Sequence, residues 1–101
     1  MNILEKIVAQ KRTEVGERKA LIPTALLEKS IYFNSPTVSL KSYLLREDKS
    51  GVIAEFKRKS PSKGNINQYA KVDEVTLGYM QSGASALSIL TDEQFFGGSD
   101  N

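Results

Sequence analysis

Two apolar strands separated by an amphipathic helix, all within residues 51–99, most limit the folds open to this chain. The first strand begins with Val52-Ile53-Ala54. The second, Ala86–Leu90, is apolar almost without alternation, so we expect it to be buried on both faces. Between the two strands, apolar residues recur at helical spacing, namely Val72, Val75, Tyr79 and Met80. Gly83 is expected to end this helix. Strand, helix and strand in this order predict a βαβ unit, with parallel strands and a right-handed crossover. The fold class is therefore α/β.

Both predicted strands run directly into polar loops. The first is followed by Ser60-Pro61-Ser62-Lys63-Gly64, and the second by Thr91-Asp92-Glu93-Gln94 and then Phe95-Phe96-Gly97-Gly98. Open α/β sheets and β/α barrels build their sites in the loops that follow the carboxyl ends of parallel strands. We therefore expect a functional site at these two loops.

The end of the first strand carries an acid and a base. Side chains two apart in a strand share a face, so Glu55 and Lys57 lie on one side, while Phe56 and Arg58 lie on the other. Charged groups on an interior face are costly unless they are paired. Either that face is wet, and the two residues form a solvated edge-strand pair, or the two charges serve a bound ligand.

Composition excludes several kinds of chemistry. The chain of 101 residues contains no Cys and no His, which removes disulfides, thiolates, Ser-His-Asp catalysis and the usual zinc ligands. Lys and Glu remain as proton-transfer groups. A net charge of +2 is too small to indicate a nucleic-acid partner. The basic run Lys57-Arg58-Lys59 is an alternative nucleic-acid patch, but strand alternation divides it between two faces.

Residues 1–50 are predicted to form a helical N-terminal extension, and residues 51–101 the βαβ unit. Asn2 caps a first helix, which Gly16 is expected to bend or fray. Further helices are predicted over 24–30 and 40–47, the last burying Leu40, Tyr43 and Leu44. No apolar run approaches the roughly 20 residues that cross a bilayer, and no signal peptide is recognisable. We therefore expect a cytoplasmic protein without a membrane partner.

Two longer motifs resemble a known family. Ala54–Gly64, AEFKRKSPSKG, and Ser82–Ser99, SGASALSILTDEQFFGGS, are similar to the first and second strand signatures of indole-3-glycerol phosphate synthase. The resemblance covers the whole chain. It implies a β/α-barrel enzyme of tryptophan biosynthesis, a carbon–carbon lyase without metal or organic cofactor. The family closes the indole ring of 1-(2-carboxyphenylamino)-1-deoxyribulose 5-phosphate and releases carbon dioxide and water.

The resemblance also implies that the barrel is incomplete. A complete (β/α)8 TIM barrel needs eight strands and about 250 residues, whereas this sequence reaches only the second strand. The family's general-acid lysine lies on the third strand and its general-base glutamate on the fourth. We therefore expect the N-terminal portion of a barrel, inactive alone. The alternative is a non-catalytic βαβ fragment that self-associates.

Specific residues match the family's site. The resemblance implies that Glu55 lines the site beside the catalytic lysine, and that Lys57 contacts the anionic substrate and assists ring closure. It implies that Ser60 and Pro61 form the loop against which the substrate's aromatic ring rests, and that Phe96 packs on that ring. The expected partner is a small substrate carrying a phosphate and a carboxylate, with no nucleic acid.

Overall fold

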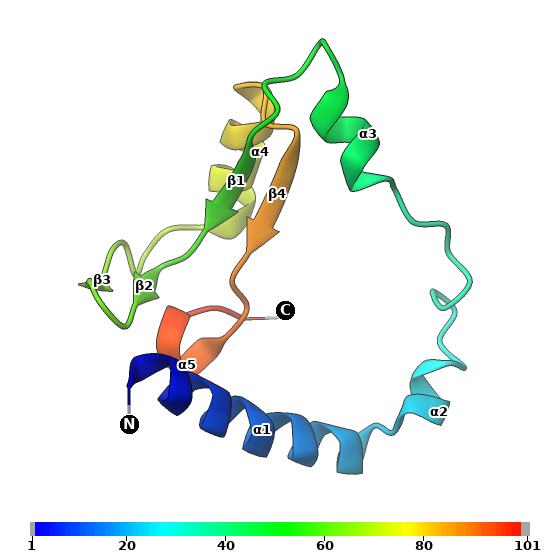
Figure 1. Ribbon diagram of the computed structural model, residues 1–101, viewed down its shortest axis with the longest axis vertical. Coiled ribbons are helices and arrows are strands. Elements are labelled where there is room, and N and C mark those ends of the chain that lie inside the picture. Colours follow the sequence, from blue (N-terminus) through cyan, green and yellow to red (C-terminus); the bar gives the residue numbers. More distant parts are fainter. Residues whose placement is uncertain (1, 100–101) are drawn as a thin grey trace. The chain divides into compact units, whose positions relative to one another are not determined.

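A computed structural model describes residues 2–99, which divide into two units: residues up to Val38, and residues from Ser39 onward. The first unit contains α1 (Ile3–Leu21) and α2 (Thr24–Leu27). The second contains α3 (Leu40–Leu45), β1 (Ile53–Phe56), β2 (Lys59–Ser60), β3 (Gly64–Asn65), α4 (Val72–Gln81), β4 (Ala86–Ile89) and α5 (Glu93–Phe96) (Figure 1).

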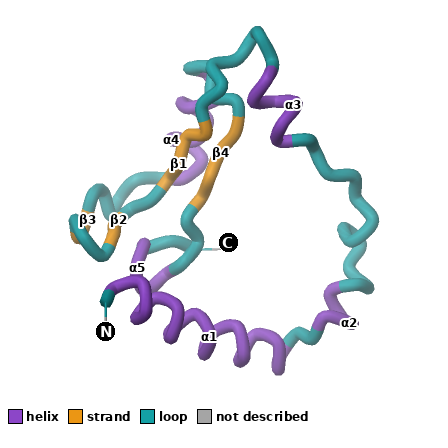
Figure 2. Tube along the Cα trace, viewed as in Figure 1, coloured by secondary structure: helices purple, strands orange, loops and turns teal. Residues whose placement is uncertain are grey.

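The first unit is a long helix followed by a short one. Asn2 caps α1 as predicted, because its side-chain oxygen accepts a hydrogen bond of 2.8 Å from the backbone N–H of Glu5. Helix α1 does not fray at Gly16, because it continues to Leu21. The predicted helix over 24–30 ends early, at Leu27, and the chain then turns, with the Ser30 hydroxyl accepting from the Tyr32 N–H. The connector before α3 is irregular (Figure 2).

The second unit is built around the predicted βαβ. β1 and β4 are parallel, and their register pairs Ile53 with Ala86 and Glu55 with Ser88. Helix α4 connects them and packs against both strands. Gly83 ends this helix as expected: its backbone φ of +94° is in the left-handed region, and its N–H donates to Met80 O. The sequence pattern over residues 51–99 is thus confirmed as α/β.

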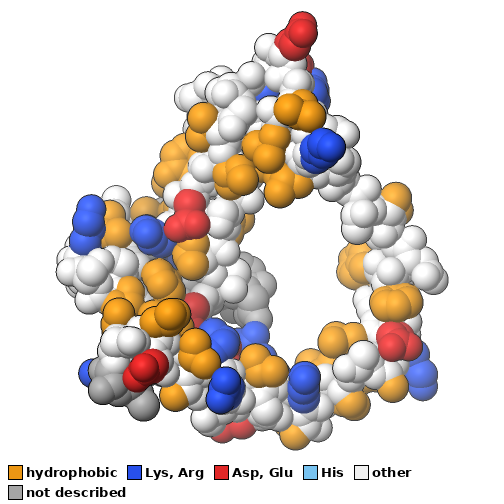
Figure 3. Space-filling model, viewed as in Figure 1, with side chains coloured by type: hydrophobic (Ala, Val, Ile, Leu, Met, Phe, Trp, Pro, Cys, Tyr) orange, Lys and Arg blue, Asp and Glu red, His pale blue; other side chains and the backbone are white. Residues whose placement is uncertain are grey.

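The core of this unit is small. Phe56, on the face of β1 that α4 covers, is 4% exposed, and Ala84 is also buried. We predicted that the second strand would be buried on both faces, and this is wrong for the described residues: Leu87 is 37% and Ile89 is 45% exposed. Helices α3 and α4 and one neighbouring strand contact β4 without enclosing it. Exposed hydrophobic side chains are visible over much of the surface (Figure 3).

Helix α3 is shorter and less buried than predicted. It begins after Ser39, whose hydroxyl accepts from the Ser42 N–H at 3.1 Å, but it ends at Leu45 and not at residue 47. Leu40 is 52% exposed, whereas Tyr43 and Leu44 are half-buried. The helix contacts β4, but its first residue lies largely in solvent.

Two short elements at the strand ends were not predicted from the sequence. The Ser-Pro-Ser break lies in an antiparallel hairpin, in which β2 pairs with β3 through Lys59–Asn65 and Ser60–Gly64. After β4, the segment expected as a loop forms the single turn of α5. Elements of two to four residues leave no periodic pattern in a sequence, so pattern reading cannot detect them.

Gly98 closes the turn after β4 and leaves no room for a side chain. A Cβ there would overlap the backbone oxygen of Leu90 and would lie 2.7 Å from Thr91 Cα. We expect Gly98→Ala to lower the free energy of unfolding by about 1–3 kcal/mol or more, since the backbone must shift. Gly78→Ala, in α4 with no atom nearby, should instead stabilise the chain by about 0.5–1 kcal/mol. Urea unfolding followed by circular dichroism compares the two, and equal stabilities would contradict the packing described.

Candidate active site

Glu55 and Lys57 form a pair at the carboxyl end of β1. Lys57 Nζ lies 3.6 Å from Glu55 Oε1, which confirms that the two side chains share a face. The Lys57 side chain is 39% exposed and the Glu55 side chain is 46% exposed. A solvent-exposed ion pair contributes only about 0–1 kcal/mol to stability. The pair is therefore of little use for folding, and both groups remain accessible to a ligand.

Two neighbours orient Glu55. The Ser88 hydroxyl donates to Glu55 Oε2 at 3.1 Å, a contact that follows from the register in which Ser88 lies opposite Glu55. Tyr79, from α4, donates its phenol O–H to the backbone oxygen of Glu55 at 3.3 Å. One carboxylate oxygen is thus held by β4 and the other faces Lys57. Ser88 was missed as a site residue, although a single polar residue within an apolar strand was a usable signal.

The predicted ring-contacting residues Ser60 and Pro61 lie on the hairpin. Ser60 is 8% exposed, and its hydroxyl oxygen accepts from the Lys63 N–H at 3.2 Å and lies 3.4 Å from Ser62 Oγ. Pro61 follows at the exposed turn. The Ser60 hydroxyl therefore stabilises the turn. Of the two residues, Pro61 is the one exposed to solvent.

Phe96 is the last residue of α5. Asp92 caps the start of this helix, and its carboxylate accepts from the Phe95 N–H at 2.7 Å. Gly97, with a φ of +66°, caps its end. Helix α5 packs against β2, so the loops after β1 and β4 meet. Within residues 2–99 no hydrogen bond or ion pair joins Phe96 or Ser60 to Glu55 and Lys57. The predicted residues thus form two groups, an ion pair and a pair of adjoining loops.

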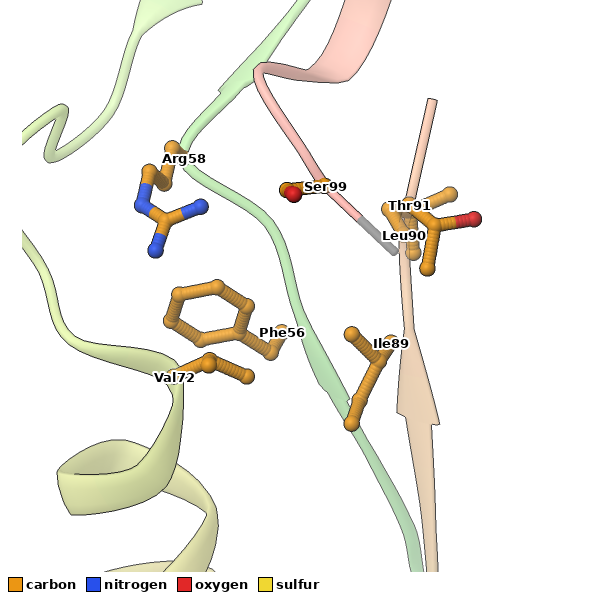
Figure 4. A pocket seen from close by; sticks show the side chains of 7 residues that line it. All are labelled: Phe56, Arg58, Val72, Ile89, Leu90, Thr91 and Ser99. Atoms are coloured by element: carbon orange, nitrogen blue, oxygen red, sulfur yellow. The ribbon is translucent and has the colours of Figure 1, made fainter. Parts of the chain in front are cut away.

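The Arg58 side chain lies on the face opposite Glu55 and Lys57 and donates hydrogen bonds to both of these loops. Its guanidinium carbon lies 5.1 Å from the centre of the Phe56 ring, its Nε donates to Ala70 O at 2.9 Å, and its Nη1 donates to Gly97 O at 3.2 Å. It also lines a pocket of about 310 Å³ together with Phe56, Val72, Ile89, Leu90, Thr91 and Ser99 (Figure 4). Strand alternation predicted the face on which Arg58 lies, but no role for this residue was predicted.

Metal and membrane features were searched over the same residues. Within 2–99, no cluster of three or more Asp and Glu side chains is placed to hold a metal ion. The same residues include no helix with the length and apolar character that a membrane span requires.

Comparison with known proteins places the chain in a family. The family described as indole-3-glycerol phosphate synthase matches residues 4–101. Proteins of that name are similar to this chain: that of Bacteroides thetaiotaomicron is 51% identical over 97% of this chain, and that of Prochlorococcus marinus is 43% identical over 97%. That of Carboxydothermus hydrogenoformans is 43% identical over 95%. The chain spans 37%, 34% and 39% of the length of these three relatives. The chain therefore belongs to the indole-3-glycerol phosphate synthase family.

Proposed function

We propose that these residues supply the first two strands of a (β/α)8 barrel that carries out the indole-3-glycerol phosphate synthase reaction. In this reaction, 1-(2-carboxyphenylamino)-1-deoxyribulose 5-phosphate loses carbon dioxide and water as its indole ring closes. The enzyme is then a carboxy-lyase of tryptophan biosynthesis. The observation that carries the proposal is the Glu55–Lys57 pair, accessible at the carboxyl end of β1 in a chain of this family.

The chemistry of the pair suits this substrate. A substrate with a phosphate and a carboxylate requires cations, and the Lys57 ammonium is a compact one. Glu55 sits between Ser88 and Lys57, so it orients the ammonium toward the open side of the strand. Assisting ring closure is thus the role we propose for Lys57, with Glu55 lining the site beside the barrel's catalytic lysine.

The adjoining loops supply an apolar surface for the substrate's ring. Pro61 is exposed on the hairpin, and Phe96 ends the helix that packs against it. Ser60 supports this surface by fixing the turn through its bond with Lys63 N–H. We propose that the aromatic ring of the substrate lies against Pro61 and Phe96, while Lys57 meets its anionic groups.

A chimeric enzyme tests this proposal. Residues 1–101 would replace the corresponding segment of the Bacteroides thetaiotaomicron relative, which is 51% identical. We expect the chimera to form indole-3-glycerol phosphate, with the unaltered relative as the positive control. A chimera that unfolds cooperatively but shows no turnover would contradict the proposal.

The sheet of the isolated chain supports a second expectation, self-association. Within the described residues, β1 and β4 have only each other as neighbours, and each face of the sheet carries an exposed isoleucine: Ile53 is 49% exposed on one face and Ile89 is 45% exposed on the other. A two-stranded sheet is marginal in water, and open strand edges pair with other chains. We therefore predict that the isolated chain associates through these strands and buries more than about 1,000 Å² in each specific interface.

Sedimentation velocity at micromolar concentration measures this association. The variant Ile89→Lys places a charge on β4 and should shift the chain toward monomer. Ile31→Lys is the matched control, because Ile31 is also an exposed isoleucine but lies in the connector after α2, away from the strands. A wild-type chain that is a stable monomer with cooperative unfolding would show that the expectation is wrong.

A further inference from the structure

We propose that Ser88 is a positioning residue, which holds the Glu55 carboxylate back from Lys57 and so keeps the ammonium group available to an anionic substrate. This role rests on the proposed function, in which Lys57 meets the anionic groups of the substrate. Ser88 acts through Glu55, and its effect is on substrate affinity. The geometry of these three side chains carries the proposal.

The Glu55–Lys57 pair is longer than a hydrogen bond. Lys57 Nζ lies 3.6 Å from Glu55 Oε1, whereas N–H···O hydrogen bonds measure about 2.7–3.2 Å. A lysine ammonium has three N–H donors, and within residues 2–99 that of Lys57 donates no hydrogen bond. The carboxylate is therefore close enough to attract the ammonium, but it occupies none of these donors.

Ser88 holds the carboxylate from the side of β4. Its hydroxyl donates to Glu55 Oε2 at 3.1 Å, because the parallel register places Ser88 opposite Glu55. Ala86 and Leu90, two residues before and after Ser88, share its face and are apolar. Of these three residues, Ser88 is thus the one whose side chain can donate to Glu55.

The backbone of Glu55 is fixed independently of Ser88. Its residue pairs with β4 in the sheet, and the Tyr79 phenol from α4 donates to its backbone oxygen at 3.3 Å. Loss of the Ser88 hydroxyl would therefore release the Glu55 side chain and leave the strand in place. Coulomb attraction then draws the released carboxylate to the ammonium, and the two groups form a charge-assisted hydrogen bond.

A hydrogen-bonded Glu55 carboxylate competes with the substrate for Lys57. The anionic group of the substrate must then displace the carboxylate before it meets the ammonium. This competition weakens the binding of substrate and transition state alike, so it raises KM and leaves kcat unchanged.

Kinetics of Ser88 variants in the chimeric enzyme test this role. We expect Ser88→Ala to raise KM about fivefold, the effect of one net hydrogen bond, and to leave kcat within about twofold of wild type. Ser88→Thr keeps the hydroxyl on a side chain that suits a strand, so its KM should stay within about twofold of wild type. A merely structural role would reduce the folded fraction, which lowers apparent kcat and leaves KM unchanged.

Ser85→Ala is the matched control. Ser85 directly precedes β4, is 4% exposed, and accepts a hydrogen bond of 2.8 Å from the Gly51 N–H. Its hydroxyl joins chain segments at the amino ends of the strands, away from Lys57. Its removal should lower the free energy of unfolding, because the Gly51 N–H loses its partner, and should leave KM unchanged. Ser88→Ala should instead change KM with little effect on stability.

A double-mutant cycle shows whether Ser88 acts through Glu55. Glu55→Gln keeps the length of the side chain but removes its charge, so no carboxylate competes for Lys57. In this background Ser88→Ala should raise KM by no more than about twofold, because the two changes are coupled. If Glu55→Gln has no turnover, titration calorimetry with the substrate gives Kd in place of KM for all variants.

The possible failures are distinguishable. An unchanged KM in Ser88→Ala, while Lys57→Ala still impairs the chimera, overturns the role of Ser88 and leaves the proposed function intact. An equal increase in KM with Glu55 and with Glu55→Gln also overturns it. If Ser88→Ala does not fold, Ser88→Cys decides, because a thiol is only a weak donor: a raised KM supports the role and a wild-type KM overturns it. A folded chimera without any turnover overturns both proposals.

Discussion

The isolated chain of 101 residues is expected to form no indole-3-glycerol phosphate. The resemblance to the family assigns the general acid to the third strand of the barrel and the general base to the fourth, and the described strands supply only the parallel pair β1 and β4. Each group of this kind typically contributes about 10²- to 10⁴-fold to the rate. The Glu55–Lys57 pair alone cannot replace two positioned proton-transfer groups.

The measurement is an assay of ring closure with the purified chain, expressed in a host whose own synthase gene is deleted. The chimeric enzyme at equal concentration serves as the positive control. Turnover by the chain that persists through purification, and that Lys57→Ala abolishes, would refute the expectation. It would mean that Glu55 and Lys57 suffice for proton transfer.

Lys57→Ala in the chimeric enzyme is expected to lower kcat/KM by at least about tenfold. A charge-assisted contact with an anion is worth roughly 1.5–3 kcal/mol, which corresponds to about 10- to 150-fold. The loss of the ammonium also leaves Glu55 without the partner that lies 3.6 Å away. An uncompensated carboxylate beside an anionic substrate repels it, which adds to the effect.

Steady-state kinetics of matched lysine variants measure this effect. Lys49→Ala is the control, because Lys49 lies in the turn before β1, at the other end of the strand from Lys57. It removes the same charge from the same unit and should leave kcat/KM near the wild-type value. Equal losses in the two variants would show that overall charge, and not the position of Lys57, governs the rate.

Side-chain alternation along β1 was predictable because it depends only on local geometry. The extended backbone of residues 53–56 sends successive side chains to opposite faces, so Glu55 meets Lys57 and Phe56 lies under Arg58. The two apolar strands and the amphipathic helix between them were predictable for the same reason. Their periodicities are visible in consecutive residues. Gly83, which ends α4, was predictable from the same local sequence.

Contacts between strands and loops were not predictable, because they join residues that are far apart in the sequence. The bond from Ser88 to Glu55 requires the register of β1 against β4, which no local pattern specifies. The exposure of Ile89 depends on which elements cover β4, so the expectation of a fully buried strand was wrong. The short α5 is held by Asp92 and by close packing at Gly97, and neither produces a helical period.

The sequence by itself determined the α/β class, the order of strand, helix and strand, the family resemblance and the side of β1 on which each charged residue lies. These follow from local backbone geometry and from motifs of consecutive residues. Only the tertiary structure decided that Ser88 donates a hydrogen bond to Glu55 and that Arg58 donates one to Gly97, the residue after Phe96. Those bonds span 33 and 39 residues, and they exist because chain folding brings the ends of two parallel strands together.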